Sequence, residues 1–142
     1  MQIGVEASRA VENKRIFVVE PDEVIRAALQ FILHDENETH EMPSLEAAYR
    51  KGQESRPDLI LLGIAMIKSL GVKVIGELKS RYPDVKVVLV AEGMERKTAE
   101  EGLEAGADDL LIKPLRVEMV RETIDRTLKR VKEKKPLFRI IQ

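Results

Sequence analysis

The sequence predicts an α/β fold, a three-layer sandwich in which a doubly wound, five-stranded parallel sheet lies between helices. Short apolar runs alternate with segments of helical apolar spacing, and few residues connect them. The 142 residues fit a single domain. Because neighbouring residues of a strand face opposite ways, a nearly continuous apolar run is buried on both faces and needs helices on both sides. The clearest such runs are Arg15–Val19, Leu59–Leu62, Val85–Val90 and Leu110–Ile112.

Three segments between these runs have the apolar spacing of amphipathic helices. Their apolar residues recur at intervals of three or four, which places them on one side of a helix. The last segment is the most regular and predicts a helix of about four turns. The positions are Val24, Ile25, Ala28, Leu29 and Ile32 in the first segment, Leu70, Val74, Ile75 and Leu78 in the second, and Val117, Val120, Ile124, Leu128 and Val131 in the third.

Three weaker elements, one strand and two helices, complete the order. Thr39–Met42 predicts a strand near an edge of the sheet, and Ser44 is a suitable N-cap for a short helix over Leu45–Lys51 that ends at the following glycine. Met94–Ala105 predicts a polar helix closed by Gly106, since glycine readily adopts the left-handed conformation of a helix end. Residues 14–133 are therefore expected to form the domain, between an N-terminal extension at 1–13 and a C-terminal tail at 134–142.

Composition and charge exclude several classes of protein. The 24 basic and 25 acidic side chains give a net charge of −1, so there is no overall field for nucleic-acid binding. The sequence has no cysteine, which excludes thiolate chemistry, and its two histidines offer few ligands for a zinc site. Met1–Lys14 has no secretory h-region, and the nine-residue apolar stretch Leu59–Ile67 is too short for a membrane span. The default expectation is a cytoplasmic protein without a membrane partner.

Function is expected at the carboxyl ends of the strands, where ligands of doubly wound sheets bind at the switch in strand order. These ends are Glu20–Asp22, Gly63–Met66, Ala91–Gly93, and Lys113 with Pro114.

At these ends the sequence resembles the receiver domain of two-component response regulators, which has a flavodoxin-like fold. The matching segments are RIFVVEPDE from Arg15, PDLILLGIAMIKSLG from Pro57, KVVLVAEG from Lys86 and GADDLLIKP from Gly106. Their spacing agrees from Pro57 to Pro114 without a forced gap, and the likeness covers about residues 14–133.

The resemblance implies a degenerate receiver site. The family's phosphate-accepting acid corresponds to Gly63, which has no nucleophile, and its metal-binding acidic pair corresponds to Glu20 and Pro21. Magnesium prefers several oxygen ligands, so neither phosphoryl transfer nor a metal is expected. The site positions are Glu20, Pro21 and Asp22 after the first strand, Gly63, Ala91 in place of a hydroxyl, Leu110 in place of an aromatic residue, and the retained Lys113 and Pro114, whose peptide the resemblance implies is cis.

Other acids do not replace the missing one. Asp58 precedes Gly63 by five residues, or roughly 16 Å of strand, and the same spacing removes Asp108 from Lys113. Lys113 is then expected to pair with Glu20, and Asp22 to cap the first helix.

The resulting hypothesis is a phosphorylation-independent signalling module, not an enzyme, that has no cofactor and binds a kinase, an output protein or a second copy of itself. In the family a surface of the fourth helix, fifth strand and fifth helix carries output. The alternatives are a receiver phosphorylated at a non-standard position, and a flavodoxin-fold enzyme or ligand-binding protein, although no glycine-rich phosphate loop follows the first strand. The expected interaction face comprises Arg96, Lys97, Glu100, Glu101, Glu104, Arg121 and Asp125.

The C-terminal region carries a further signal. Residues 126–135 contain six basic side chains and one acid, which favours a solvated helix end. Leu137–Ile141 has four apolar residues among five after a proline. This segment either folds back on the domain, pairs with another chain, or marks a junction with further sequence, and its residues do not rank these alternatives.

Overall fold

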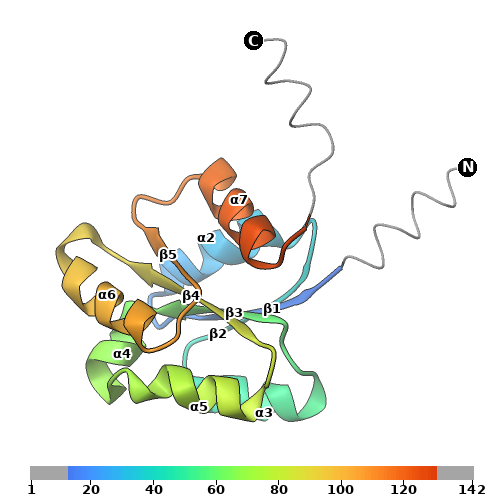
Figure 1. Ribbon diagram of the computed structural model, residues 1–142. Coiled ribbons are helices and arrows are strands. Elements are labelled where there is room, and N and C mark those ends of the chain that lie inside the picture. Colours follow the sequence, from blue (N-terminus) through green and yellow to red (C-terminus); the bar gives the residue numbers. More distant parts are fainter. Residues whose placement is uncertain (1–12, 131–142) are drawn as a thin grey trace, which may run out of the picture.

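The computed structural model describes residues 13–130, and in this part of the chain strands and helices alternate (Figure 1). The strands are β1 (Arg15–Val19), β2 (Glu38–Met42), β3 (Leu59–Gly63), β4 (Lys86–Ala91) and β5 (Asp109–Ile112). The helices are α2 (Glu23–Leu33), α3 (Leu45–Glu54), α4 (Ile64–Leu70), α5 (Lys73–Arg81), α6 (Arg96–Glu104) and α7 (Val117–Thr127), with a 3-10 turn, η1 (Gly93–Glu95), before α6.

The strands form one parallel sheet in the order β2-β1-β3-β4-β5, which confirms the predicted doubly wound fold and the edge position of β2. Figure 1 shows α2 and α7 on one face of the sheet and α3, α4, α5 and α6 on the other. The chain order reverses between β1 and β3, so the switch point lies where these two strands end.

The strands are buried on both faces, as the continuous apolar runs predict. On β1, Ile16 and Val18 belong to the apolar cluster beneath α2 and α7, whereas Phe17 and Val19 belong to the cluster beneath α3, α4, α5 and α6. All four side chains are fully buried. Each strand therefore contributes alternate residues to two separate apolar layers.

The predicted stripe on the first helix is partly wrong. Ile25, Leu29 and Ile32 face the sheet, but Val24 is 76% exposed and Ala28 is also exposed. Apolar residues cover more of the circumference of α2 than the sheet can bury, and the packing selects the side centred on Leu29.

The second predicted helix is two helices. Gly71, with φ of 90°, separates α4 from α5, and Leu70 is 49% exposed instead of continuing the stripe of Val74 and Leu78. The strand-end segment Gly63–Met66 is helical from Ile64 onward, with Gly63 as the N-cap of α4.

Helix ends agree with the sequence at some positions and differ at others. The Ser44 hydroxyl accepts a hydrogen bond from the Ala47 N–H at 3.2 Å, and Gly106 has φ of 123°, so both signals are confirmed. Gly52 does not end α3, which continues to Glu54. The polar helix begins only at Arg96, after a 3-10 turn whose capping box joins Glu92 and Glu95.

The last helix is shorter than predicted. α7 ends at Thr127, and Lys129 adopts φ of 61°, which turns the chain so that the Arg130 N–H bonds the Asp125 carbonyl. Val131, the tail predicted at 134–142, and residues 1–12 of the extension predicted at 1–13 lie outside the described residues. Among residues 13–130, no helix is long and apolar enough to cross a membrane.

Candidate degenerate receiver site

Four neighbouring strands, β1, β3, β4 and β5, bring their carboxyl ends together at one edge of the sheet. Glu20 directly follows β1, Gly63 ends β3, Ala91 ends β4 and Lys113 directly follows β5. Since β1, β3, β4 and β5 are successive neighbours, these positions form a row across the switch point, as the sequence predicts.

The Glu20 side chain fills the space beside Gly63. Glu20 is only 6% exposed, and a Cβ placed on Gly63 would lie 2.9 Å from Glu20 Cδ and closer still to Oε1. Gly63 has φ of −63°, which any residue adopts, so its backbone does not require glycine. A side chain at this position would therefore have to displace the Glu20 carboxylate.

Burial dominates the electrostatics of Glu20 and raises the pKa of its carboxyl group. The Asp22 N–H donates to Oε2 at 2.9 Å, and this bond, with the charges of Lys113 and Arg26, lowers the pKa in part. The Arg26 guanidinium also donates to the Glu20 carbonyl at 2.9 Å. The loop after β1 is therefore held by its own polar groups.

The expected ion pair between Lys113 and Glu20 is wrong. Lys113 Nζ lies 3.7 Å from Glu92 Oε2, and Glu92 follows β4, the direct neighbour of β5. Glu20 follows β1, two strands further along the sheet, so its carboxylate influences Lys113 only from a greater distance.

The residues present do not fit the magnesium ion on which phosphoryl transfer in this type of site depends. The Asp22 carboxylate is engaged as the N-cap of α2, where Oδ1 accepts from Val24 N at 2.9 Å and Ile25 N at 3.1 Å. This confirms its capping role. Pro21 and Gly63 carry no oxygen-bearing side chain, which leaves Glu20, and a magnesium ion needs more ligands. No group of three or more His, Asp or Glu suited to a metal occurs within residues 13–130.

Two acids considered as substitutes lie at the opposite edge of the sheet, as expected. Asp58 Oδ2 accepts from the Arg15 N–H at 2.8 Å, at the start of β1. Asp108 Oδ2 accepts from the Val87 N–H at 2.8 Å and pairs with Lys79 at 2.7 Å. Both carboxylates stabilise strand beginnings and are far from the strand ends.

The remaining site positions are apolar or structural. Ala91 is fully buried, Leu110 is half-buried against the apolar cluster beneath α6, and neither offers a polar group to the site. The peptide between Lys113 and Pro114 is cis, which confirms the expectation from the resemblance. The Lys113 N–H donates to the Ala91 carbonyl at 2.9 Å, which extends the β4–β5 pairing to this turn.

The expected interaction face divides into two sets. The five α6 positions are exposed, whereas Asp125 is 6% exposed and its carboxylate pairs with Arg130 at 2.9 Å. Arg121 donates to the Ile32 carbonyl at 3.2 Å, so it lies against α2. The expectation that both residues are exposed beside the α6 positions is contradicted for Asp125, which is buried, whereas Arg121 is half-buried and contacts α2. The exposed residues, hereafter the α6 face, are Arg96, Lys97, Glu100, Glu101 and Glu104.

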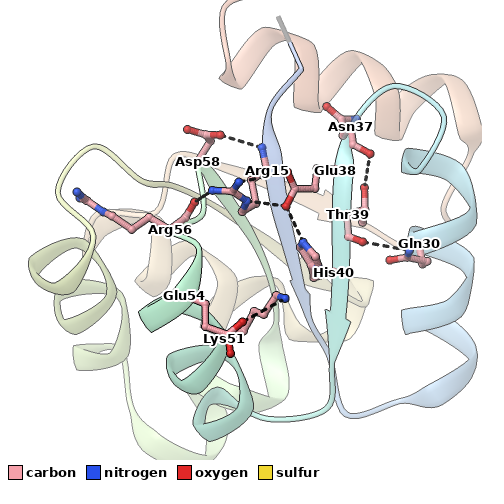
Figure 2. Close-up of polar contacts among 10 residues, drawn as sticks. All are labelled: Arg15, Gln30, Asn37, Glu38, Thr39, His40, Lys51, Glu54, Arg56 and Asp58. Atoms are coloured by element: carbon pink, nitrogen blue, oxygen red, sulfur yellow. Dashed lines mark hydrogen bonds and ion pairs between the residues drawn. The ribbon is translucent and has the colours of Figure 1, made fainter. Parts of the chain in front are cut away.

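A polar cluster that the sequence pattern did not indicate lies at the amino-terminal edge of the sheet (Figure 2). The Arg15 guanidinium donates to Glu38 at 2.7 Å and 3.2 Å, and His40 Nε2 lies 2.8 Å from the same carboxylate. The hydrogen bond from Arg15 is the main reason that the pKa of Glu38 falls to about 2. Arg15 and Glu38 are direct cross-strand partners, so the register of β1 and β2 was the signal that could have identified the pair.

The sheet order and the row of strand ends at the switch point agree with a receiver-type domain. The family profile described as response regulator receiver domain matches residues 16–125, and the chain belongs to this family.

Several relatives are transcriptional regulatory proteins. ResD of Bacillus subtilis is 34% identical over 101 residues, which cover 70% of this chain and 42% of that protein. CitT of Bacillus subtilis is 34% identical over 86 residues, which cover 61% of this chain and 36% of that protein. The chain thus spans less than half the length of these relatives.

Solved structures agree in fold. NtrX from Brucella abortus, in complex with ATP, superposes with a TM-score of 0.75 at 25% identity, over 91% of this chain and 28% of that chain. The N-terminal signal receiver domain of a response regulator from Bacteroides fragilis superposes with a TM-score of 0.77 over 84% of this chain and 100% of that chain. Its identity is 22%, so that likeness concerns the fold alone.

Proposed function

We propose that this receiver domain works without accepting a phosphoryl group and signals by binding a protein partner. The observation that carries the proposal is the Glu20 carboxylate in the space beside Gly63, where a receiver needs an accepting acid. One oxygen of Asp22 caps α2, and Pro21 and Gly63 supply no carboxylate, so fewer oxygen ligands face this space than a magnesium ion prefers. In this site Glu20 and Gly63 pack against each other, and neither is placed to take part in phosphoryl transfer.

The two alternative functions have less support. A non-standard acceptor would need an accessible carboxylate, but Glu20 is 6% exposed, and Asp58 and Asp108 are engaged at the far edge of the sheet. An enzyme would need a nucleophile with a base partner at the strand ends. At these ends Gly63 has no side chain and Ala91 has only a methyl group. We therefore propose that the domain is not catalytic.

The experiment that tests phosphorylation independence is incubation of the full chain with acetyl phosphate and Mg²⁺ at neutral pH, followed by intact mass measurement. A receiver domain that has an acid at the end of its third strand serves as the positive control under the same conditions. We expect the mass of this chain to stay unchanged. Addition of one phosphoryl group would reject the proposal, and peptide mapping would then identify the acceptor.

The partner surface we propose is the α6 face, whose mixed charges can fix the partner and its register. The partner class is a kinase, an output protein or a second copy of this chain, without direct nucleic-acid contact. The test measures how much partner protein the purified full chain captures. The unchanged chain is compared with Lys97→Glu on α6, and with Lys73→Glu on α5 as a matched control. We expect at least a tenfold loss of capture for Lys97→Glu and none for Lys73→Glu; equal capture by both variants would contradict the assignment.

A further inference from the structure

α2 presents an apolar stripe to solvent. Val24 and Phe31 are 76% and 74% exposed, and Ala27 and Ala28 between them are also exposed. Their spacing of three, four and seven residues places all four on one side of the helix, opposite the side that contacts the sheet. We call these four residues the α2 stripe. A contiguous exposed apolar surface on a domain with 35% charged residues indicates a docking site.

The described chain ends beside the C-terminal end of α2. Arg130 Nη1 donates to Asn37 Oδ1 at 2.7 Å, and Asn37 Nδ2 donates to the Leu33 carbonyl of α2 at 3.1 Å. Figure 1 shows α7 and α2 on the same face of the sheet, and Arg121 joins them through the Ile32 carbonyl. These contacts hold Arg130, the last of the described residues, next to the end of α2 that carries Phe31, and twelve residues, 131–142, follow it in the sequence.

The sequence after Arg130 complements the α2 stripe in polarity and charge. Leu137–Ile141 supplies four apolar residues among five. It lies in a segment with four basic side chains and one acid, Glu133. The α2 stripe is bounded by exposed acids at both ends. The basic residues are Lys132, Lys134, Lys135 and Arg139, and the acids of α2 and its flanks are Asp22, Glu23, Asp35 and Glu36.

The lengths are compatible with contact inside one chain. Seven residues from Arg130 to Leu137 span up to about 24 Å, whereas the α2 stripe from Phe31 to Val24 extends about 10 Å along the helix. Leu137–Ile141 extended covers about 13 Å, which matches the length of the α2 stripe. No other chain is needed to bring the segment to this surface.

We propose that Leu137–Ile141 packs on the α2 stripe of its own chain. The contact buries Val24 and Phe31 under the apolar side chains of the tail and brings its basic residues near the acids at the ends of α2. Because α2 begins at the loop that holds Glu20, the docked tail covers the helix next to the strand ends. A partner that uses this side of the domain would compete with the tail. The inference is independent of the proposed function.

The absence of cysteine allows a direct test in the full chain. A nitroxide attached through Gln142→Cys broadens amide signals near the end of the tail in a ¹⁵N NMR spectrum, and the reduced nitroxide gives the reference. We expect the amides of residues 24–31 to lose at least half their intensity, while Glu77 on α5, on the other face of the sheet, keeps its intensity. Equal intensity ratios for α2 and α5 would overturn the proposal.

Two further measurements separate the outcomes. In a mixture of ¹⁵N-labelled chain without cysteine and unlabelled spin-labelled chain, broadening of the α2 stripe would make a second copy the occupant and overturn the proposal. In the spin-labelled chain we expect Phe31→Glu to reduce the broadening at least threefold. The matched control Met94→Glu changes another exposed apolar residue, 87% exposed, and should leave the broadening unchanged. Equal broadening in both variants would also overturn the proposal.

Discussion

At the scale of single residues, Gly63 and Glu20 act as one unit. A glycine at the end of a buried strand usually weakens the strand, but here the missing side chain leaves the space that the Glu20 carboxylate occupies. The carboxylate is held by the Asp22 N–H at 2.9 Å and is shielded from water. Changing either residue should therefore change the effect of changing the other.

A double-mutant cycle tests this dependence. We expect Gly63→Ala to lower the free energy of unfolding by about 1–3 kcal/mol, because its Cβ would displace Glu20 from its hydrogen bond. In the Glu20→Ala background the same change should cost less than about 0.5 kcal/mol. Urea unfolding of the unchanged protein, the two single variants and the double variant gives the coupling free energy between Gly63 and Glu20. An equal cost of Gly63→Ala in both backgrounds would show that Glu20 does not occupy the space.

The Glu38 cluster predicts how stability changes in acid. The pKa of Glu38 falls from 4.5 to about 2 in the fold, so between these values the unfolded chain binds more protons. The stabilisation by Arg15 and His40 is therefore present above pH 4.5 and is lost as the pH falls toward 2. Since the Glu38 side chain is 40% exposed, Glu38→Gln should cost less than about 1 kcal/mol at pH 7.

The measurement is urea unfolding of the protein and of Glu38→Gln at several pH values from 7 down to 2. The difference between the two proteins should shrink as the pH falls below 4.5. Glu104→Gln, on the exposed side of α6, controls for removal of one surface carboxyl. A difference that stays constant down to pH 2 would contradict the role assigned to Glu38.

At the scale of helices and strands, the inner strands could be predicted because burial on both faces leaves a continuous apolar run in the sequence. The buried side and the ends of each helix were harder to predict, because contacts with other elements determine them. On α2 the five positions of the predicted stripe cover a wide arc, and the sheet buries only the part around Leu29. Gly52 looks like a helix end in the sequence, but its absent side chain accommodates Tyr82 from beyond α5.

Two helical glycines provide a matched pair of substitutions. A Cβ on Gly52 would lie 2.7 Å from Cζ of the buried Tyr82 ring, whereas a Cβ on Gly76, inside α5, would have nothing within 4 Å. We expect Gly52→Ala to lower the free energy of unfolding by about 1–3 kcal/mol. Gly76→Ala should raise it by about 0.5–1 kcal/mol because alanine favours helix.

Thermal and urea unfolding of both variants measures these changes. Because both substitutions add the same methyl group to a helix, their difference isolates the contact with Tyr82. If Gly52→Ala were as stabilising as Gly76→Ala, the packing of α3 against Tyr82 would be incorrect.

At the scale of the whole molecule, the position of the site could be predicted from topology, but its interior could not. Parallel order alone brings Glu20, Gly63, Ala91 and Lys113 to one edge. Lys113 pairs with Glu92 because the strands that these two residues follow, β5 and β4, are neighbours in the sheet. That Glu20 fills the space at Gly63 depends on how one side chain packs against a residue 43 positions away, and no local pattern encodes such a contact.

The shared sheet also determines how the molecule unfolds. Every inner strand contributes alternate residues to both apolar clusters, so neither cluster can separate without the strands of the other. Leu29 belongs to the cluster beneath α2 and α7, Leu78 belongs to the opposite one, and both are fully buried. We expect Leu29→Ala and Leu78→Ala each to cost about 2–5 kcal/mol and to leave a single transition.

The chain carries a convenient probe for this expectation. Its two tyrosines, Tyr49 and Tyr82, both pack with the cluster on the α3 and α5 side, so tyrosine fluorescence reports on that face alone. If the sheet couples the faces, Leu29→Ala should shift the urea midpoint seen by tyrosine fluorescence as much as the midpoint seen by far-ultraviolet circular dichroism. A tyrosine transition that stays in place while the circular dichroism transition moves would mean that the two faces unfold separately and that the strands do not couple the layers.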